Sequence, residues 1–136
     1  MWKAGINYGH GTGHGVGHFL NVHEGPHQFR MNHVPALLLP GMTITNEPGI
    51  YKAGRHGVRT ENTMLIVQSQ RTEFGDFYKF EPLTLCPIDK EAIHAEMLTD
   101  EEKGWLNKYH RQVYEQLCPM LNAEEQAWLK QATSAI

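Results

Sequence analysis

The clearest alternation of apolar and polar residues lies between positions 58 and 68, and it predicts the longest strand of the chain. Side chains of a strand alternate between two faces, so one face carries Val58, Thr60, Asn62, Met64 and Ile66. On the opposite face, Glu61 follows Arg59 and precedes apolar residues. A charge in such a position is unfavourable unless a partner compensates it. We therefore expect a compensating group beside this carboxylate.

Shorter stretches predict further extended structure. Residues 5–23 are expected to form extended segments joined by glycines, and residues 27–41 a polar loop. A β-branched, alternating strand is predicted at 42–47, with a brief extension at 50–51. A last strand is predicted at 78–85.

Further along the chain, the period changes to that of helices. Thr99 and Glu102 have the spacing of a capping box, in which each side chain binds the other residue's backbone N–H group. The apolar face of the predicted helix carries Trp105, Leu106, Tyr109, Val113 and Leu117. Pro119 is expected to end this helix.

A second helix is predicted to start at Asn122, with Glu125 completing its cap. It carries Trp128 and Leu129. The apolar faces of both helices are typical of internal packing, and a subunit contact is the alternative for their aromatic side chains. The change of period near Ile88 is a candidate subdomain boundary.

Composition narrows the functional classes. The 136 residues are enough for one modest domain, and 40% hydrophobic and 20% charged residues are typical of a globular protein. A net charge of −3 without basic clusters argues against nucleic-acid binding. No apolar stretch approaches the ~20 residues that span a bilayer. Cys86 and Cys118 lack metal-type spacing and suit a reducing compartment, so the cytoplasm is expected.

A histidine- and glycine-rich tract is the most unusual stretch of the chain. If residues 9–17 are extended, every glycine lies on one face. Glycine permits close approach of another backbone, a ligand or a metal, so something is expected to sit against this tract. A flexible segment with incidental metal affinity is the alternative. The tract and the residues after it hold His10, His14, His18 and His23.

Two familiar motifs are excluded. His23 to His27 matches His-Glu-x-x-His, which binds zinc only when a helix places both histidines on one face. Gly25-Pro26 inside that interval is incompatible with a regular helix. The glycines of the tract alternate strictly, so they never give the dinucleotide pattern Gly-x-Gly-x-x-Gly.

His14, Glu47 and Glu61 are candidate metal ligands, because imidazole and carboxylates together suit divalent metals, and oxygen-rich sites favour manganese. Each has a structural alternative: a satisfied histidine, a turn residue before Pro48, and an ion pair with Arg59. Adjacent strands about 4.8 Å apart can bring such side chains to one point.

Four motifs occur in order: Gly-His-Gly-Thr-Gly-His-Gly-Val-Gly (9–17), Asn-Val-His-Glu-Gly-Pro (21–26), Gly-Met-Thr-Ile-Thr-Asn-Glu-Pro-Gly-Ile-Tyr (41–51) and Gly-Val-Arg-Thr-Glu-Asn (57–62). Together they resemble the C-terminal half of the catalytic domain of cytosolic-type Xaa-Pro aminopeptidase (aminopeptidase P). This family belongs to the creatinase, prolidase and methionine aminopeptidase superfamily. Residues 80–88 and 105–110 resemble the C-terminal extension of its longer forms.

The resemblance implies an α+β chain that forms the C-terminal half of a pita-bread fold, a curved antiparallel sheet followed by C-terminal helices. Residues 1–88 are expected to belong to the catalytic domain. Residues 89–136 are expected to form a helical extension packed on it. A prolidase- or creatinase-like sister enzyme and a non-enzymatic pita-bread binding module are the alternatives.

The resemblance also implies two divalent metal ions, manganese in this branch, with zinc or cobalt as alternatives. By motif, His14, Glu47 and Glu61 correspond to metal ligands, and Glu61 to the ligand that bridges both ions. The reaction implied is hydrolysis of the N-terminal Xaa-Pro bond of a peptide by a metal-bridging hydroxide.

Three further residues correspond to catalytic positions of the family. His10 corresponds to a histidine lining the substrate site, His23 to one that contacts substrate and helps proton transfer, and Arg59 to one that supports the charge network. The implied partners are peptides with proline in the second position, not nucleic acid or membranes.

The chain departs from the family at two aspartate ligands, which belong upstream of the glycine–histidine motif. Its aspartates, Asp76, Asp89 and Asp100, all lie downstream. We therefore expect a piece of a larger enzyme that lacks peptidase activity alone. Half of a pita-bread sheet exposes apolar surface and strand edges, so a homo-oligomer is expected.

Overall fold

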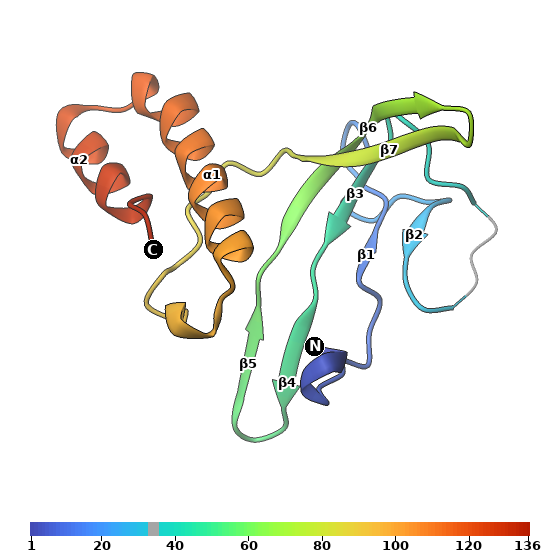
Figure 1. The fold of residues 1–136 in the computed structure, drawn as a ribbon, viewed down its shortest axis with the longest axis horizontal. Coiled ribbons are helices and arrows are strands. Elements are labelled where there is room, and N and C mark those ends of the chain that lie inside the picture. The colour runs from blue at the N-terminus through green and yellow to red at the C-terminus, as the bar shows by residue number, and fades with distance from the viewer. Residues whose placement is uncertain (33–35) are drawn as a thin grey trace. The chain divides into compact units, whose positions relative to one another are not determined.

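The computed structural model describes residues 1–32 and 36–136, which form two units, Met1–Thr84 and Leu85–Ile136. The first unit contains the strands and the second the α-helices (Figure 1). The elements of the first unit are η1 (Trp2–Ala4), β1 (Gly13–His14), β2 (Gln28–Phe29), β3 (Thr43–Asn46), β4 (Gly49–Lys52), β5 (His56–Arg59), β6 (Asn62–Thr72) and β7 (Gly75–Pro82).

The described residues of the first unit form three antiparallel sheets. The largest has the order β3-β6-β7, and the pairs β1-β2 and β4-β5 form the others. Its core includes Ile44 of β3 and Met64 and Ile66 of β6, which are all buried. Within β6, the face predicted from the alternation is therefore confirmed.

The strand predicted at 58–68 is interrupted. β5 ends at Arg59 and β6 begins at Asn62, so the expectation of one continuous strand is wrong. Val58, predicted to share the face of the core residues, is 57% exposed. The paired segment is interrupted too, because β3, which pairs with β6, ends before β4, which pairs with β5, begins (Figure 1). Pro48 lies in that gap and has no N–H group to donate to a ladder.

Other boundaries also differ from expectation. Of the segment predicted as extended at 5–23, only Gly13–His14 forms a strand. The predicted loop at 27–41 contains β2, and its residues 33–35 lie outside the described residues. The strand predicted at 78–85 starts earlier, at Gly75, because β6 and β7 form a tight hairpin in which Thr72 lies opposite Gly75.

The second unit contains η2 (Ala95–Met97), α1 (Asp100–Leu117), η3 (Cys118–Met120) and α2 (Ala123–Ala132). Both predicted capping boxes are present. The Thr99 side chain accepts from the Glu102 N–H group, and the Glu102 carboxylate accepts from the Thr99 N–H group. Asn122 and Glu125 make the same reciprocal pair at α2. Local sequence therefore defines both helix starts correctly.

The core of the second unit is built from Tyr109, Val113 and Leu129. The apolar face predicted for α1 is partly wrong, because Trp105 is 59% exposed. The predicted Leu106, Tyr109 and Val113 are buried, and the packed face also includes His110, whose side chain is fully buried. None of the helices among the described residues is both long and apolar enough to cross a membrane.

Candidate metal centre

The two interruptions face each other and place two carboxylates in opposition. Asn46 pairs with Asn62 on one side of the gap, and Gly49 pairs with Arg59 on the other. Both ladders are antiparallel and in the same register, so Glu47 lies across from Glu61. Side chains at opposed positions of antiparallel strands lie about 5 Å apart, and like charges there repel. Positive charge in this gap would therefore offset the repulsion between the two carboxylates.

Arg59 supplies positive charge at this point. Its Nη1 lies 3.1 Å from Oε2 of Glu47 and 3.9 Å from Oε2 of Glu61. The guanidinium also lies over the ring of Tyr51, 5.6 Å from the centroid. The compensating partner expected for the Glu61 carboxylate is thus Arg59, which Glu61 shares with Glu47.

Glycine brings the histidine tract against β3. A Cβ atom at Gly13 would lie only 1.7 Å from the carbonyl oxygen of Thr45. A Cβ atom at Gly15 would lie 2.0 Å from the carbonyl oxygen of Glu24. The expectation that glycine admits a close neighbour therefore holds at these two positions, where the nearest neighbour is backbone. It also holds at Gly17, where a Cβ atom would lie 2.7 Å from a carboxylate oxygen of Glu24. At Gly9 no atom lies within 4 Å, so the expectation fails there.

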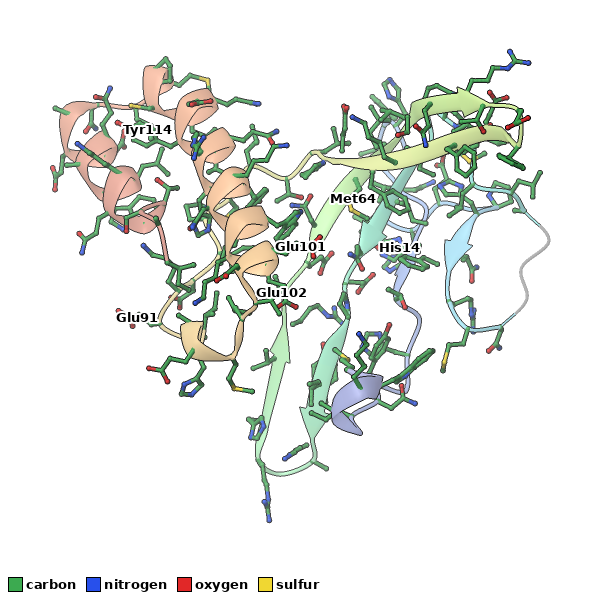
Figure 2. The ribbon with its side chains drawn as sticks, viewed as in Figure 1. His14, Met64, Glu91, Glu101, Glu102 and Tyr114 are labelled. Atoms are coloured by element: carbon green, nitrogen blue, oxygen red, sulfur yellow. The ribbon has the colours of Figure 1, made fainter. Side chains whose placement is uncertain are left out.

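This approach brings His14 to Glu47, with Nε2 of the imidazole 3.1 Å from Oε1 of the carboxylate. Figure 2 shows the His14 side chain within the strand unit. Nδ1 lies 2.9 Å from the carbonyl oxygen of Gly15, which can only accept, so Nδ1 carries the proton. The Glu47 oxygen also only accepts, so a proton or a cation is needed between it and Nε2. Metal-binding histidines commonly donate one ring N–H group to a carbonyl oxygen, as Nδ1 does here.

The remaining histidines predicted for the site lie close by. The ring centroid of His23 is 4.0 Å from that of His14. The ring of His10 contacts Tyr8 and Tyr51, with centroids 5.0 and 5.7 Å away. Nδ1 of His10 lies 2.6 Å from the carbonyl oxygen of Gly11. Its Nε2 is buried without a hydrogen-bond partner among the described residues.

A cavity of about 620 Å³ collects most of these groups. Its lining includes His10, His14, His23, Glu47 and Arg59. Glu61 is not among the lining residues, and its side chain is 43% exposed. Across residues 1–32 and 36–136, no three histidine, cysteine or acidic side chains converge closely enough to hold a metal. The candidate ligands thus meet as the pair His14–Glu47, with Glu61 joined to them through Arg59.

Two residues near the site were not predicted to belong to it. Thr45 bonds to both His14 and Glu47, and its position two residues before Glu47 on one strand face was the available signal. His27 is 7% exposed, and its Nε2 lies 2.7 Å from the carbonyl oxygen of Thr43. No local pattern predicts that contact, because it depends on how the chain folds back after residue 25.

Two family models match the chain, and the second begins within β7 of the first unit. Residues 1–68 match the model of metallopeptidase family M24, and residues 76–136 match that of the C-terminal region of peptidase M24. All of the chain aligns with a probable Xaa-Pro aminopeptidase P of Coprinopsis cinerea at 44% identity, over 23% of that protein. All of it also aligns with aminopeptidase P1 of Arabidopsis thaliana at 46% identity, over 22% of that protein.

A solved structure shows the same fold. The chain matches the crystal structure of X-prolyl aminopeptidase from Caenorhabditis elegans, described as a cytosolic enzyme with a di-nuclear active site. The TM-score is 0.88 at 37% identity, over 99% of this chain and 22% of that one. The likeness confirms the expected α+β class and the C-terminal half of a pita-bread fold. The chain spans about a quarter of the length of these relatives.

Proposed function

Because this chain belongs to metallopeptidase family M24, we propose that it contributes the His14, Glu47 and Glu61 side of a two-metal centre in an Xaa-Pro aminopeptidase. The observation that carries this proposal is the geometry of His14. Its Nδ1 is fixed on the carbonyl oxygen of Gly15, and its Nε2 is directed at the Glu47 carboxylate.

The donor set suits the proposed group. One imidazole lone pair and two opposed carboxylates match a divalent cation that accepts nitrogen and oxygen ligands, and manganese is the ion that we propose. When bound, two such ions lower the pKa of water and polarise a peptide carbonyl.

The other side chains have separate roles in the proposal. Arg59 holds the Glu47 carboxylate in place through its contact of 3.1 Å. His23, whose ring lies against that of His14, moves a proton beside the ligand pair. His10 forms the cavity wall that contacts the peptide. The substrates proposed are peptides with proline in the second position. The proposed compartment is the cytosol, because the matched Caenorhabditis elegans enzyme is described as cytosolic.

We also propose that the chain by itself does not hydrolyse such peptides. Its three aspartates, Asp76, Asp89 and Asp100, do not line the cavity. Asp76 instead pairs with Arg71 on the β6–β7 hairpin, where its carboxylate lies 3.6 Å from the guanidinium. Only part of the carboxylate set for two metals is therefore available.

A manganese titration of the purified chain tests the proposal. We expect Mn²⁺ binding that His14→Ala abolishes, and no release of the first residue from an Xaa-Pro peptide. His18→Ala is the matched control, because His18 belongs to the same tract but is exposed and lies outside the cavity lining. Equal binding by the two variants would contradict the ligand assignment. Turnover by the isolated chain would contradict the proposed inactivity, and absence of binding would favour a binding module.

A further inference from the structure

One buried hydroxyl connects the two strands that carry the candidate ligands. Thr45 of β3 is 3% exposed. Its Oγ1 accepts a hydrogen bond from the backbone N–H group of His14 at 3.0 Å and donates one to Oε1 of Glu47 at 2.9 Å. A hydroxyl has one donor and two acceptor sites, so these two bonds use it in both senses.

The backbone around Thr45 shows that this link replaces a regular ladder bond. On one side the Glu47 N–H group donates to the Thr12 carbonyl at 2.7 Å. On the other side the Val16 N–H group donates to the Thr43 carbonyl at 3.3 Å. In a regular antiparallel ladder, the His14 N–H group between them would bond to a backbone carbonyl. Here the Thr45 side chain takes that position.

Thr45 and His14 contact the same oxygen of the Glu47 carboxylate. Oε1 lies 2.9 Å from Oγ1 of Thr45 and 3.1 Å from Nε2 of His14. Oε2 is held by Arg59 at 3.1 Å. The Glu47 carboxylate is therefore constrained at both oxygens, and Thr45 is the only one of these partners that also holds the backbone of His14.

We propose that Thr45 is a positioning residue, whose hydroxyl sets the distance between the His14 and Glu47 side chains and so prepares them to bind one cation together. The link between strands follows from the hydrogen bonds alone. Its importance for metal binding rests on the proposed function.

Hydrogen exchange of the metal-free chain tests the link itself. Thr45→Val keeps the shape of the side chain but removes the hydroxyl, and should speed exchange of the His14 amide by about tenfold, the equivalent of one hydrogen bond. Thr45→Ser should retain protection. Thr43→Val is the matched control, because Thr43 lies on the same strand as Thr45. This variant removes a hydroxyl hydrogen bond of 2.8 Å to the Val16 carbonyl. It should leave His14 protected.

Unchanged exchange in Thr45→Val would overturn the proposal, as would equal acceleration in Thr43→Val. Thr45→Ala is measured alongside, so that the result does not depend on whether valine is tolerated. The amide spectrum of each variant reports whether the first unit remains folded.

Manganese affinity tests the role in metal binding. Loss of a residue that orients a ligand typically weakens metal affinity about 10- to 100-fold, and we expect this for Thr45→Val. Thr45→Ser and Thr43→Val should bind as the unsubstituted chain does. Equal manganese affinity of the unsubstituted and Thr45→Val chains would overturn the positioning role. Failure of the unsubstituted chain to bind would instead contradict the proposed metal centre, while the exchange result still decides the link.

Discussion

At the scale of single residues, the missing side chain of Gly13 and the buried side chain of His110 control local packing. Gly13 lets the histidine tract lie against β3, at a distance where even a methyl group overlaps the Thr45 carbonyl. His110 is fully buried in the helical unit, where its Nε2 accepts a hydrogen bond from the Ile88 N–H group at 3.0 Å. Gly13 lets His14 reach Glu47, and His110 makes the helical unit sensitive to acid.

Gly13→Ala should destabilise the strand unit. Its Cβ atom would overlap backbone that cannot rotate away, and such overpacking lowers the free energy of unfolding by about 2–3 kcal/mol. Gly9→Ala is the control, because its Cβ atom meets nothing within 4 Å. Its stability should be unchanged or raised by up to about 1 kcal/mol. Urea unfolding followed through the amide signals of β3 measures both, and equal stability of the two variants would contradict the steric argument.

The helical unit should lose stability in mild acid. Burial, followed by the positive charge of Lys90, lowers the pKa of His110 below its ordinary value of 6.5. Its Nδ1 is buried without a hydrogen-bond partner among the described residues, and protonation of Nε2 would abolish acceptance from Ile88. Below about pH 6.5 the unfolded chain therefore binds a proton that the folded chain does not, so stability falls until the folded pKa is reached.

Thermal unfolding followed by circular dichroism at 222 nm tests this pH dependence. The midpoint should be constant above pH 7 and should fall as the pH drops below about 6.5. His110→Gln should flatten this fall, whereas His94→Gln should preserve it because His94 is exposed. A fall of the same size in His110→Gln would assign the effect to other groups.

At the scale of elements, the paired interruption of two strands is what creates the candidate site. β3 and β6 pair on one side of the gap and β4 and β5 on the other, in a common register. The gap frees Glu47 and Glu61 from regular pairing while keeping them opposite each other. In the helical unit, by contrast, the elements are regular, and packing decides which face is buried.

Two neighbouring residues of α2 test that packing. Leu129 is 1% exposed and belongs to the core, whereas Trp128 is 62% exposed. Leu129→Ala should lower the free energy of unfolding by about 3 kcal/mol, because it leaves a cavity beside Tyr109 and Val113. Trp128→Ala should cost less than about 1 kcal/mol. A greater loss from Trp128→Ala in chemical denaturation would show that the indole is covered in solution.

At the scale of the whole molecule, the chain carries the fold of one part of a much longer peptidase. The structural likeness extends over 99% of this chain but 22% of the matched enzyme. Several apolar side chains are open to solvent. Phe19, Leu20 and Val22 are 88%, 78% and 65% exposed within one short loop. Such a patch favours contact with another apolar surface.

Self-association of the chain remains a prediction. Light scattering at high protein concentration should give a mass above the 15.5 kDa of one chain. Replacing Phe19 and Leu20 together by serine should shift the mass toward that of the monomer, because it removes the most exposed part of the patch. A monomeric mass for the unsubstituted chain would contradict the expectation.

The sequence by itself determined those features that depend on neighbours along the chain. The caps at Thr99 and Asn122 need only residues three positions away, and the buried face of β6 follows from a period of two. The family follows from motifs that are contiguous in the chain. These interactions are short in range, so local residue patterns contain them.

Tertiary structure alone decided what depends on distant segments. The break at Thr60–Glu61 is opposite Pro48, and the burial of His110 and exposure of Trp105 depend on how the helices pack. The link from Thr45 to His14 joins residues 31 positions apart. No local pattern specifies such contacts, because they form only when folding brings separate strands together and excludes water between them.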